Sequence, residues 1–485
     1  MLKIFPILHV LGLVILLFAF TMLLPLAVSL YYQDAAQHAY DEAILITFTA
    51  GLVMWFATRS RKRELQTRDG FLLVTLVWAV LPVFATLPLL LYLPQLSFTD
   101  AYFETMSGLT TTGATVLSGL DQLPPSINVW RSELVWVGGM GLIVLAVAIL
   151  PLLGVGGRQM FKAETPGPMK DSKLTPRIAQ TAKGLWLVYA GITLACGVAY
   201  WLAGMTLLDA LIHAFSTMGL GGFSSHDASF GYFNSPAIEA VTIVFMLIAG
   251  VNFATHFVAI RQLTIAPYRQ DSEAWAFWFV TLASCIGIAV FLWARQIYPD
   301  FWQALRYATF NTVSIATSTG FANTDYYMWP IFAPLWMLLL SSFASSSGST
   351  GGGIKMVRAM LLFKQGVREM TRLVHPQALL PVKLQKQVVA NQIIYAILAF
   401  LFLYLCSVIV MTLLLTASGL DFITAFSAVI ATINNTGPGL NQVGPATTYA
   451  ALTDFQIWVC TFAMLLGRLE IFTVLVLFTP AFWRK

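Results

Sequence analysis

Four tetrads of small, mostly polar residues and glycine are the part of this sequence whose residue types and spacing suggest chemistry. Each tetrad ends in a glycine that follows an alanine by twelve residues, as Gly113 follows Ala101. The tetrads are Thr110-Thr111-Thr112-Gly113, Gly219-Leu220-Gly221-Gly222, Thr317-Ser318-Thr319-Gly320 and Asn434-Asn435-Thr436-Gly437. One tetrad would be an ordinary glycine loop, but four copies at equal spacing indicate a fourfold internal repeat.

The tetrads offer neutral oxygen atoms to a cation. Backbone carbonyls can replace the hydration shell of a monovalent cation, and we expect the closing glycines to supply the unusual φ angles that this requires. A helix before each tetrad would point its partly negative carbonyl end at the same cavity. Because divalent cations prefer carboxylates and the tetrads contain none, the composition predicts a monovalent ion. The hydroxyls of Thr112, Thr319 and Thr436 either add ligands or pack against the backbone.

A second polar stretch, residues 341–353, interrupts an apolar span. It ends in Gly348-Ser349-Thr350-Gly351-Gly352-Gly353, and each glycine costs a helix about 1 kcal/mol relative to alanine. The glycine spacing is that of a phosphate-binding loop, but Lys355 is displaced behind Ile354 and no Ser or Thr follows it. The sequence therefore predicts a flexible break in the membrane span rather than a nucleotide site.

Arg468 lies in the apolar stretch Leu465-Leu466-Gly467-Arg468-Leu469-Glu470. A charge that faces lipid costs several kcal/mol, so a polar interior is expected. One interpretation is a structural ion pair with Glu470 or another buried acid, and the other is a cation in an ion path. We expect the polar residues of three other apolar segments, His213, Asn252 and His256, to be hydrogen-bonded between helices.

Composition places the chain in a membrane. Of its 485 residues 58% are hydrophobic and 10% charged, and the mean hydropathy is +0.77, whereas soluble domains carry about 25% charged residues. The net charge of +5 indicates retention of basic loops on the inner face rather than nucleic-acid binding. No nucleophile and base are paired at helical spacing inside the spans, which argues against an enzyme.

The expected fold is an all-α polytopic membrane protein with two N-terminal spans, 4–31 and 44–57, followed by four repeats of span, re-entrant segment and span. Each re-entrant segment is apolar but too short to cross the bilayer, so four returns imply a shared polar axis. The three segments of the successive repeats are 71–93, 100–117 and 134–153; 185–203, 209–224 and 238–260; 275–294, 301–322 and 329–345; and 388–415, 421–439 and 455–482.

The basic residues support this layout. Of the 27 Lys and Arg residues, all but Arg131, Arg295, Arg306 and Arg468 lie at the termini or in the loops 59–70, 154–184, 260–274 and 351–388. This bias predicts that these loops and both termini are cytoplasmic. We expect Arg131, Arg295 and Arg306 near outer loops, which leaves Arg468 as the basic residue well inside a span.

The sequence resembles the TrkH subunits of the bacterial Trk/Ktr/HKT potassium transporter superfamily over residues 71–485, and its first two spans resemble those of the Trk branch. The resemblance rests on Met106-Ser107-Gly108-Leu109-Thr110-Thr111-Thr112-Gly113-Ala114, Trp136-Val137-Gly138-Gly139-Met140-Gly141, Ser347-Gly348-Ser349-Thr350-Gly351-Gly352-Gly353-Ile354-Lys355 and Asn434-Asn435-Thr436-Gly437-Pro438-Gly439. Only one glycine matches per tetrad, where a potassium channel has a TVGYG run.

This resemblance implies a potassium selectivity filter formed by the four tetrads around a pseudo-fourfold pore. It implies a gate formed by residues 348–353 and Arg468, no cofactor in this chain, and a soluble TrkA-like partner with nucleotide-binding RCK domains. We expect a homodimer in the bacterial inner membrane, divided into a two-span extension, 1–70, and pore repeats 71–157, 158–262, 263–386 and 387–485.

The hypothesis from the sequence is therefore potassium uptake through a gated, moderately selective channel-like pore that also passes rubidium and leaks some sodium. The alternative is a proton- or sodium-coupled symporter. Coupled transporters place carboxylates near the membrane midplane, and Glu104 and Glu470 are the candidates.

Overall fold

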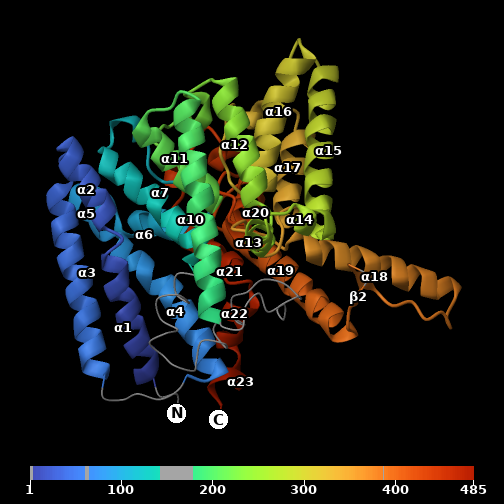
Figure 1. Cartoon of the computed structure of the whole chain (residues 1–485), viewed down its shortest axis with the longest axis horizontal. Coiled ribbons are helices and arrows are strands. Elements are labelled where there is room, and N and C mark those ends of the chain that lie inside the picture. Colours follow the sequence, from blue (N-terminus) through green and yellow to red (C-terminus); the bar gives the residue numbers. More distant parts are fainter. Residues whose placement is uncertain (1–3, 60–64, 142–177, 386, 485) are drawn as a thin grey trace.

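A computed structural model describes residues 4–59, 65–141, 178–385 and 387–484. Nearly all regular elements are helices (Figure 1). By length and apolar composition, six described helices are able to span a membrane, or eight if two bent helix pairs are each counted as one span. The fold class predicted from the sequence is confirmed. The basic residues 61–63 and the loop 154–177 lie outside the described residues.

The N-terminal extension contains α1 (Phe5–Ala19), α2 (Leu23–Tyr32) and α3 (Gln37–Thr58). Helices α1 and α3 pack through small residues, because a Cβ atom on Gly12 would lie 2.8 Å from the backbone nitrogen of Trp55, and one on Gly51 would lie 2.7 Å from that of Leu16. Close backbone approach through glycine is a common way to join membrane helices.

Each of the four repeats has a first span, a short pore helix and a second helix. The first spans are α4 (Thr67–Ala85) with α5 (Leu87–Tyr92), α10 (Ile178–Leu202), α15 (Ser272–Ala294) and α19 (Asn391–Ala417). The pore helices are α6 (Phe98–Leu109), α11 (Leu207–Gly219), α16 (Phe301–Ala316) and α20 (Phe422–Ile433). The second helices are α7 (Pro125–Gly139), α12 (Pro236–Ala249), α17 (Phe332–Phe343) and α21 (Asp454–Arg468).

Shorter elements connect these helices or follow them. They are α13 (Phe253–Gln262), α14 (Ala266–Gln270), α18 (Met356–Val374), α22 (Phe472–Leu475) and α23 (Pro480–Trp483), the antiparallel strands β1 (Lys383–Leu384) and β2 (Gln387–Val388), and the 3-10 turns η1 (Leu120–Gln122), η2 (Ser229–Gly231), η3 (Tyr326–Met328), η4 (Asn441–Val443), η5 (Tyr449–Ala451) and η6 (Val476–Phe478). In Figure 1, α18 extends away from the helix bundle.

The pore helices are re-entrant, as predicted. At 12 to 16 residues and about 1.5 Å per residue, each is shorter than the roughly 30 Å hydrocarbon core. Each begins at a capping side chain that accepts a hydrogen bond from the backbone three residues on, namely Ser97, Thr206, Asp300 or Asp421. Such caps satisfy an N–H that has no partner within the helix.

The continuous second spans predicted over 238–260 and 455–482 are wrong. Helices α12 and α13 meet at 94°, and α21 meets the segment Phe472–Phe478 at 107°. At the first break the Asn252 side chain accepts a hydrogen bond from Ala254 N at 2.8 Å and starts a new helix. At the second, Glu470 and Ile471 adopt left-handed φ angles of 55° and 54°, which no right-handed helix contains.

In the third repeat, the second span breaks after α17, as predicted from the serine and glycine content of the residues that follow. Three of the four repeats therefore interrupt their second helix. In the first repeat, α7 ends at Gly139, and the rest of the predicted span 134–153 lies outside the described residues from position 142 onward.

We expect Gly12→Ile to separate α1 from α3, because its added side chain has no room against the α3 backbone. Overpacking of this kind costs about 1–3 kcal/mol, so the thermal unfolding midpoint in detergent should fall. Gly287→Ile is the control, since a Cβ at Gly287 meets no atom within 4 Å. Equal midpoints for the two variants would contradict the close approach.

Candidate ion site

All four tetrads follow their pore helices with the same backbone geometry. The second residue of each is left-handed, with φ of 56° at Thr111, 53° at Leu220, 59° at Ser318 and 52° at Asn435. The amide of that residue bonds to the carbonyl three residues back, and the next amide bonds to the carbonyl five residues back. This hydrogen-bond pattern is a recognised helix ending, and it reverses the chain at the same point in every repeat.

The glycine that closes each tetrad also lets the backbones of two neighbouring repeats approach closely. A Cβ on Gly113 would overlap Gly222 N, one on Gly222 would lie 2.6 Å from Gly320 C, one on Gly320 would overlap Thr436 O, and one on Gly437 would lie 2.7 Å from Thr112 O. These contacts run from the first repeat to the fourth and return to the first. The four tetrads thus form a closed ring.

The expectation that all four glycines adopt unusual φ angles is wrong for one of them. Gly113, Gly320 and Gly437 have φ of 77°, 88° and 96°, whereas Gly222 lies outside the left-handed region. At Gly222 the contact with the third repeat is what excludes a side chain.

The ring leaves carbonyl oxygens available to a cation. Within the described part of the chain, most tetrad carbonyls accept no hydrogen bond, and the exceptions are Gly221 O, which accepts from Phe223 N, and Gly437 O, which accepts from Tyr449 Oη. Orphaned buried carbonyls are costly unless something replaces water, and a dehydrated monovalent cation does so.

The threonine hydroxyls fall into two classes. Thr112 pairs with Thr110 at 2.8 Å and Thr319 pairs with Thr317 at 2.7 Å. The buried Thr436 hydroxyl has no protein partner among the described residues. The four walls of the ring are therefore chemically unequal.

Polar side chains connect each of the first three pore helices to the chain that leaves its tetrad. Glu104 accepts from Thr115 Oγ1 and Val116 N, His213 Nε2 lies 2.9 Å from Ser224 Oγ, and Asn311 donates to Asn323 at 2.6 Å. His213 is thus hydrogen-bonded as expected, although within one repeat.

The other two polar residues singled out in apolar segments are also bonded. His256 reaches Tyr268 Oη at 2.7 Å and the Ile248 carbonyl at 2.9 Å. Asn252 caps its own helix, α13, rather than joining two helices.

Arg131, which the sequence prediction placed near an outer loop, is buried against the segments that leave the first two tetrads, where it donates to Thr115 Oγ1 and Ser224 O. Its side chain is 1% exposed, and its Nε lies 2.8 Å from Glu104 Oε1. Local hydropathy missed this residue because its charge is neutralised by a partner 27 positions earlier. Arg468, which is partly buried, is therefore not the one basic residue in the interior, because Arg131, Lys355 and Arg358 are buried.

The glycine-rich loop, residues 344–355, lies against the tetrads. Thr350 Oγ1 donates to Met218 O at 3.0 Å, next to the second tetrad. A Cβ on Gly351 would lie 2.9 Å from Thr317 O, and one on Gly352 would overlap Asn434 O. The loop thus contacts the second, third and fourth repeats where their pore helices end. Within it, Lys355 Nζ donates to Gly351 O.

Arg468 completes this arrangement at the first repeat. Its guanidinium lies 3.2 Å from Thr111 Oγ1, 2.9 Å from Thr350 O, and 2.5 Å from Gly138 O. Of the two interpretations of Arg468, the ion pair with Glu470 is not observed, because the Glu470 carboxylate lies 2.5 Å from Arg358. Arg468 therefore bridges the first tetrad and the glycine-rich loop.

Glu273 is a site residue that sequence reasoning missed. It accepts hydrogen bonds from Ser347 N at 2.7 Å, Ser347 Oγ at 2.9 Å and Val357 N at 3.0 Å, which holds both ends of the loop. Its only signal in the sequence is a carboxylate in the first turn of an apolar span, α15, and its burial is visible only in the structure. An acidic residue in the first turn of a helix is ordinary, so the sequence does not distinguish Glu273 as a site residue.

On the side of the ring where the pore helices begin, His226 joins two repeats. Its Nδ1 contacts Asp121, its Nε2 lies 3.3 Å from Asp209 Oδ1, and its ring stacks on Tyr232 at 3.5 Å. The Asp227 carboxylate accepts from Gly119 N and Leu120 N. Burial alone would lower the pKa of His226, but the carboxylates of Asp209 and Asp121 raise it above its ordinary value.

We expect the contacts of His226 with Asp121 and Asp209, here called the His226 clamp, to stabilise the fold less at alkaline pH. Because the folded-state pKa of His226 is raised, its contribution to stability is complete below the unfolded pKa of about 6.5 and is lost as pH rises through the folded pKa. The thermal midpoint of wild type should exceed that of His226→Gln by more at pH 6 than at pH 9. A difference independent of pH would contradict a charged clamp.

The groups that face His226 include Asp121, Asp209, Asp227 and His213, whose ring centroid lies 6.4 Å away. Asp121 has a lowered pKa; burial opposes the shift, and the bond from His226 drives it. The contribution of Asp121 to stability is complete above the ordinary pKa of an aspartate and is lost as the pH falls. The thermal midpoints of wild type and His226→Gln must therefore be compared above about pH 5. His213→Asn is the control for loss of a nearby imidazole.

Comparison with known proteins agrees with this geometry. The family model described as TrkH, cation transport protein, matches residues 37–292 and 299–485. The Trk system potassium uptake protein TrkH of Vibrio parahaemolyticus is 47% identical over 482 residues, covering 99% of both chains. The protein of that name from Escherichia coli K12 is 45% identical, covering 98% of this chain and 99% of the relative.

A solved structure gives the same result. The crystal structure of the potassium transporter TrkH from Vibrio parahaemolyticus superimposes with a TM-score of 0.90 at 45% identity, covering all of both chains. Among the described residues, no group of three or more His, Cys, Asp or Glu side chains is placed to hold a metal ion. With matched sequence, fold and length, the chain belongs to the TrkH family of cation transport proteins.

Proposed function

We propose that this protein takes up potassium across the bacterial inner membrane through a channel-like pore, down the electrochemical gradient. The observation that carries the proposal is the closed ring of four tetrads with carbonyls that lack protein donors. Similarity to proteins named for potassium uptake supports the choice of ion. In this proposal the tetrads 110–113, 219–222, 317–320 and 434–437 are the selectivity filter.

The filter discriminates only moderately among alkali cations. Its second wall, Gly219-Leu220-Gly221-Gly222, carries no hydroxyl, and its fourth begins with two asparagines whose amides are used elsewhere. Asn435 donates to Thr112 Oγ1 at 3.0 Å, which ties the fourth wall to the first. Unequal walls give fewer well-defined sites, so rubidium passes with potassium and some sodium leaks.

The gate consists of residues 348–353 and Arg468. Support comes from their contacts, which together reach all four repeats where the pore helices end. A partly buried guanidinium beside the ion path opposes a permeating cation electrostatically, and movement of the loop removes its partner at Thr350.

The protein acts as a homodimer. A cytosolic nucleotide-binding partner of the RCK type regulates it.

The glycine-rich loop leads directly into α18, an amphipathic helix that stands away from the bundle in Figure 1. A partner that binds α18 has a short covalent route to the loop through Lys355. In this proposal both termini lie in the cytoplasm. The boundaries of the four repeats are those expected from the sequence.

The coupled-symport alternative loses support from the two carboxylates on which it depended. Glu104 accepts hydrogen bonds from Arg131, Thr115 and Val116, and Glu470 pairs with Arg358. Both carboxylates already have an arginine partner, so neither is a free ligand for a coupling ion.

Rubidium flux into liposomes that contain the purified protein tests the proposed pore. We expect rubidium uptake down its gradient, inhibited by external potassium and much less by lithium. Equal flux of lithium and rubidium would rule out a selective filter. Uphill rubidium accumulation driven by a pH gradient alone would establish the symport alternative.

Arg468→Ala tests the gate. Without its charge and its bond to Thr350, we expect rubidium flux in the absence of a partner to rise several-fold. Arg295→Ala removes an exposed arginine at the end of α15 that stacks on Phe291, and it should leave flux unchanged. Unchanged flux in a folded Arg468→Ala protein would assign the arginine a structural role.

A further inference from the structure

A cavity of about 1050 Å³ lies between the second and third repeats. Residues of α10, α12, α13, α14 and α15 line it, and none belongs to a tetrad or to the glycine-rich loop. In the view of Figure 1, α13 and α14 lie between α10 and the lower end of α15. The cavity is therefore separate from the proposed ion path.

The cavity opens toward the membrane. Helices α10 and α15 are spans of which 33% and 39%, respectively, are buried inside the protein. The mouth includes Leu187, Ile260 and Trp275, each more than half exposed. Gly191 of α10 also lines the cavity and is exposed, and a Cβ there would meet no atom within 4 Å. An apolar cavity with this exposure is accessible to a hydrocarbon chain.

One end of the cavity is cationic and aromatic. Arg269 lines it and is exposed, and it forms no hydrogen bond or ion pair with the described residues. Trp275 and Trp278 lie beside it, and tryptophan is typical of the membrane interface. Of the other polar lining groups, His256 and Tyr268 bond to each other at 2.7 Å. Arg269 is thus the available binding group.

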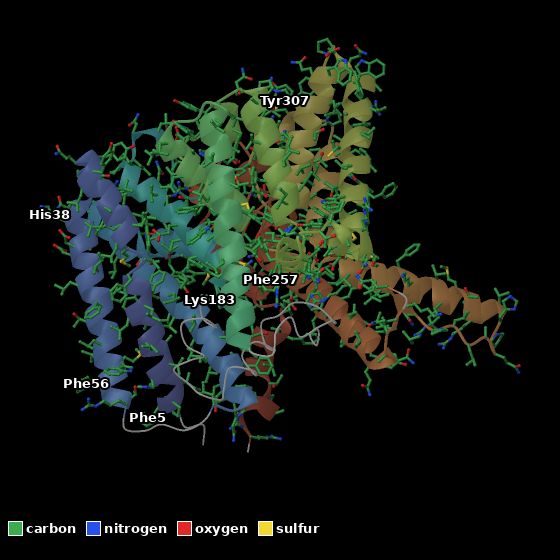
Figure 2. All side chains as sticks on the ribbon, in the orientation of Figure 1. Phe5, His38, Phe56, Lys183, Phe257 and Tyr307 are labelled. Carbon is green, nitrogen blue, oxygen red and sulfur yellow. The ribbon has the colours of Figure 1, made fainter. Side chains whose placement is uncertain are left out.

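Two further exposed cations lie on neighbouring elements. Arg261 is in the last turn of α13, and Lys183 precedes Gly184, at which a Cβ would overlap the Phe257 ring of α13. Figure 2 labels Lys183 and Phe257 on these helices. The Asp271 carboxylate, two residues after Arg269 in the sequence, accepts hydrogen bonds from Thr255 Oγ1 and from the first amides of α15. The charge near the mouth is therefore positive.

We propose that this cavity binds an anionic glycerophospholipid, with an acyl chain along α10 beside Gly191 and the phosphate at Arg269. Basic pockets between membrane helices select anionic headgroups, and the apolar walls accept a chain that is already present in the bilayer. A protein segment is disfavoured as the occupant because the mouth lies between two lipid-exposed spans.

Native mass spectrometry of the full-length protein tests this site. The protein is purified in detergent and mixed with dioleoyl phosphatidylglycerol or dioleoyl phosphatidylcholine. We expect wild type to retain one phosphatidylglycerol at least several-fold better than phosphatidylcholine. Arg269→Gln should remove that preference, and Gly191→Leu, which fills the chain position, should reduce retention of both lipids.

The controls are matched in chemistry. Gly287→Leu places the same side chain at another open glycine outside the cavity, and Arg295→Gln removes an exposed arginine at the opposite end of α15; neither should change retention. Ala195→Leu, also on the cavity wall, replaces Gly191→Leu if that variant does not fold. The proposal would be overturned if Arg269→Gln and the leucine variant both retained phosphatidylglycerol as well as wild type does. It would also be overturned if the variants altered the dimer but not the amount of bound lipid.

Discussion

Backbone carbonyls that lie deep in a membrane without protein donors constrain the rest of this structure. The four pore helices end inside the protein and reverse at a left-handed residue, which leaves oxygens unpaired in each tetrad. Lipid supplies no hydrogen bond, so such backbone persists only where protein surrounds it or a polar path is present. The closed ring of glycine contacts provides that enclosure.

The second helices follow from the same constraint. Three of them break near the ends of the pore helices, and the breaks contact one another: Gly250 O accepts from Ser346 N, and Asn252 lies against Gly348. Straight spans would fill the space in which the glycine-rich loop lies. Two arginine–carboxylate pairs hold this interior together: Arg131 with Glu104, which is fully buried, and Arg358 with Glu470, which is partly buried. Removal of one partner from such a pair leaves an uncompensated charge, so each pair is maintained as a unit.

Local sequence patterns predicted the re-entrant helices well. Each re-entrant segment is apolar, too short to cross the bilayer and followed by a tetrad, and these properties are read within about fifteen residues. The same patterns failed at 238–260 and 455–482. Hydropathy is averaged over a window, and neither Asn252 nor Ile471 lowers that average enough to reveal a bend of about a right angle.

The sequence by itself determined the number of repeats, the position of each chain reversal and the neutral chemistry of the tetrads, because spacing, length and residue type are local properties. Only the tertiary structure decided which glycine meets which repeat, that Gly222 serves close approach alone, and that Glu273 holds the loop. It also decided the partners of the buried charges. Arg468 bonds to Gly138, 330 residues away, while the adjacent Glu470 pairs with Arg358. Contacts across such separations depend on how the four repeats pack around one axis, and no local pattern encodes that packing.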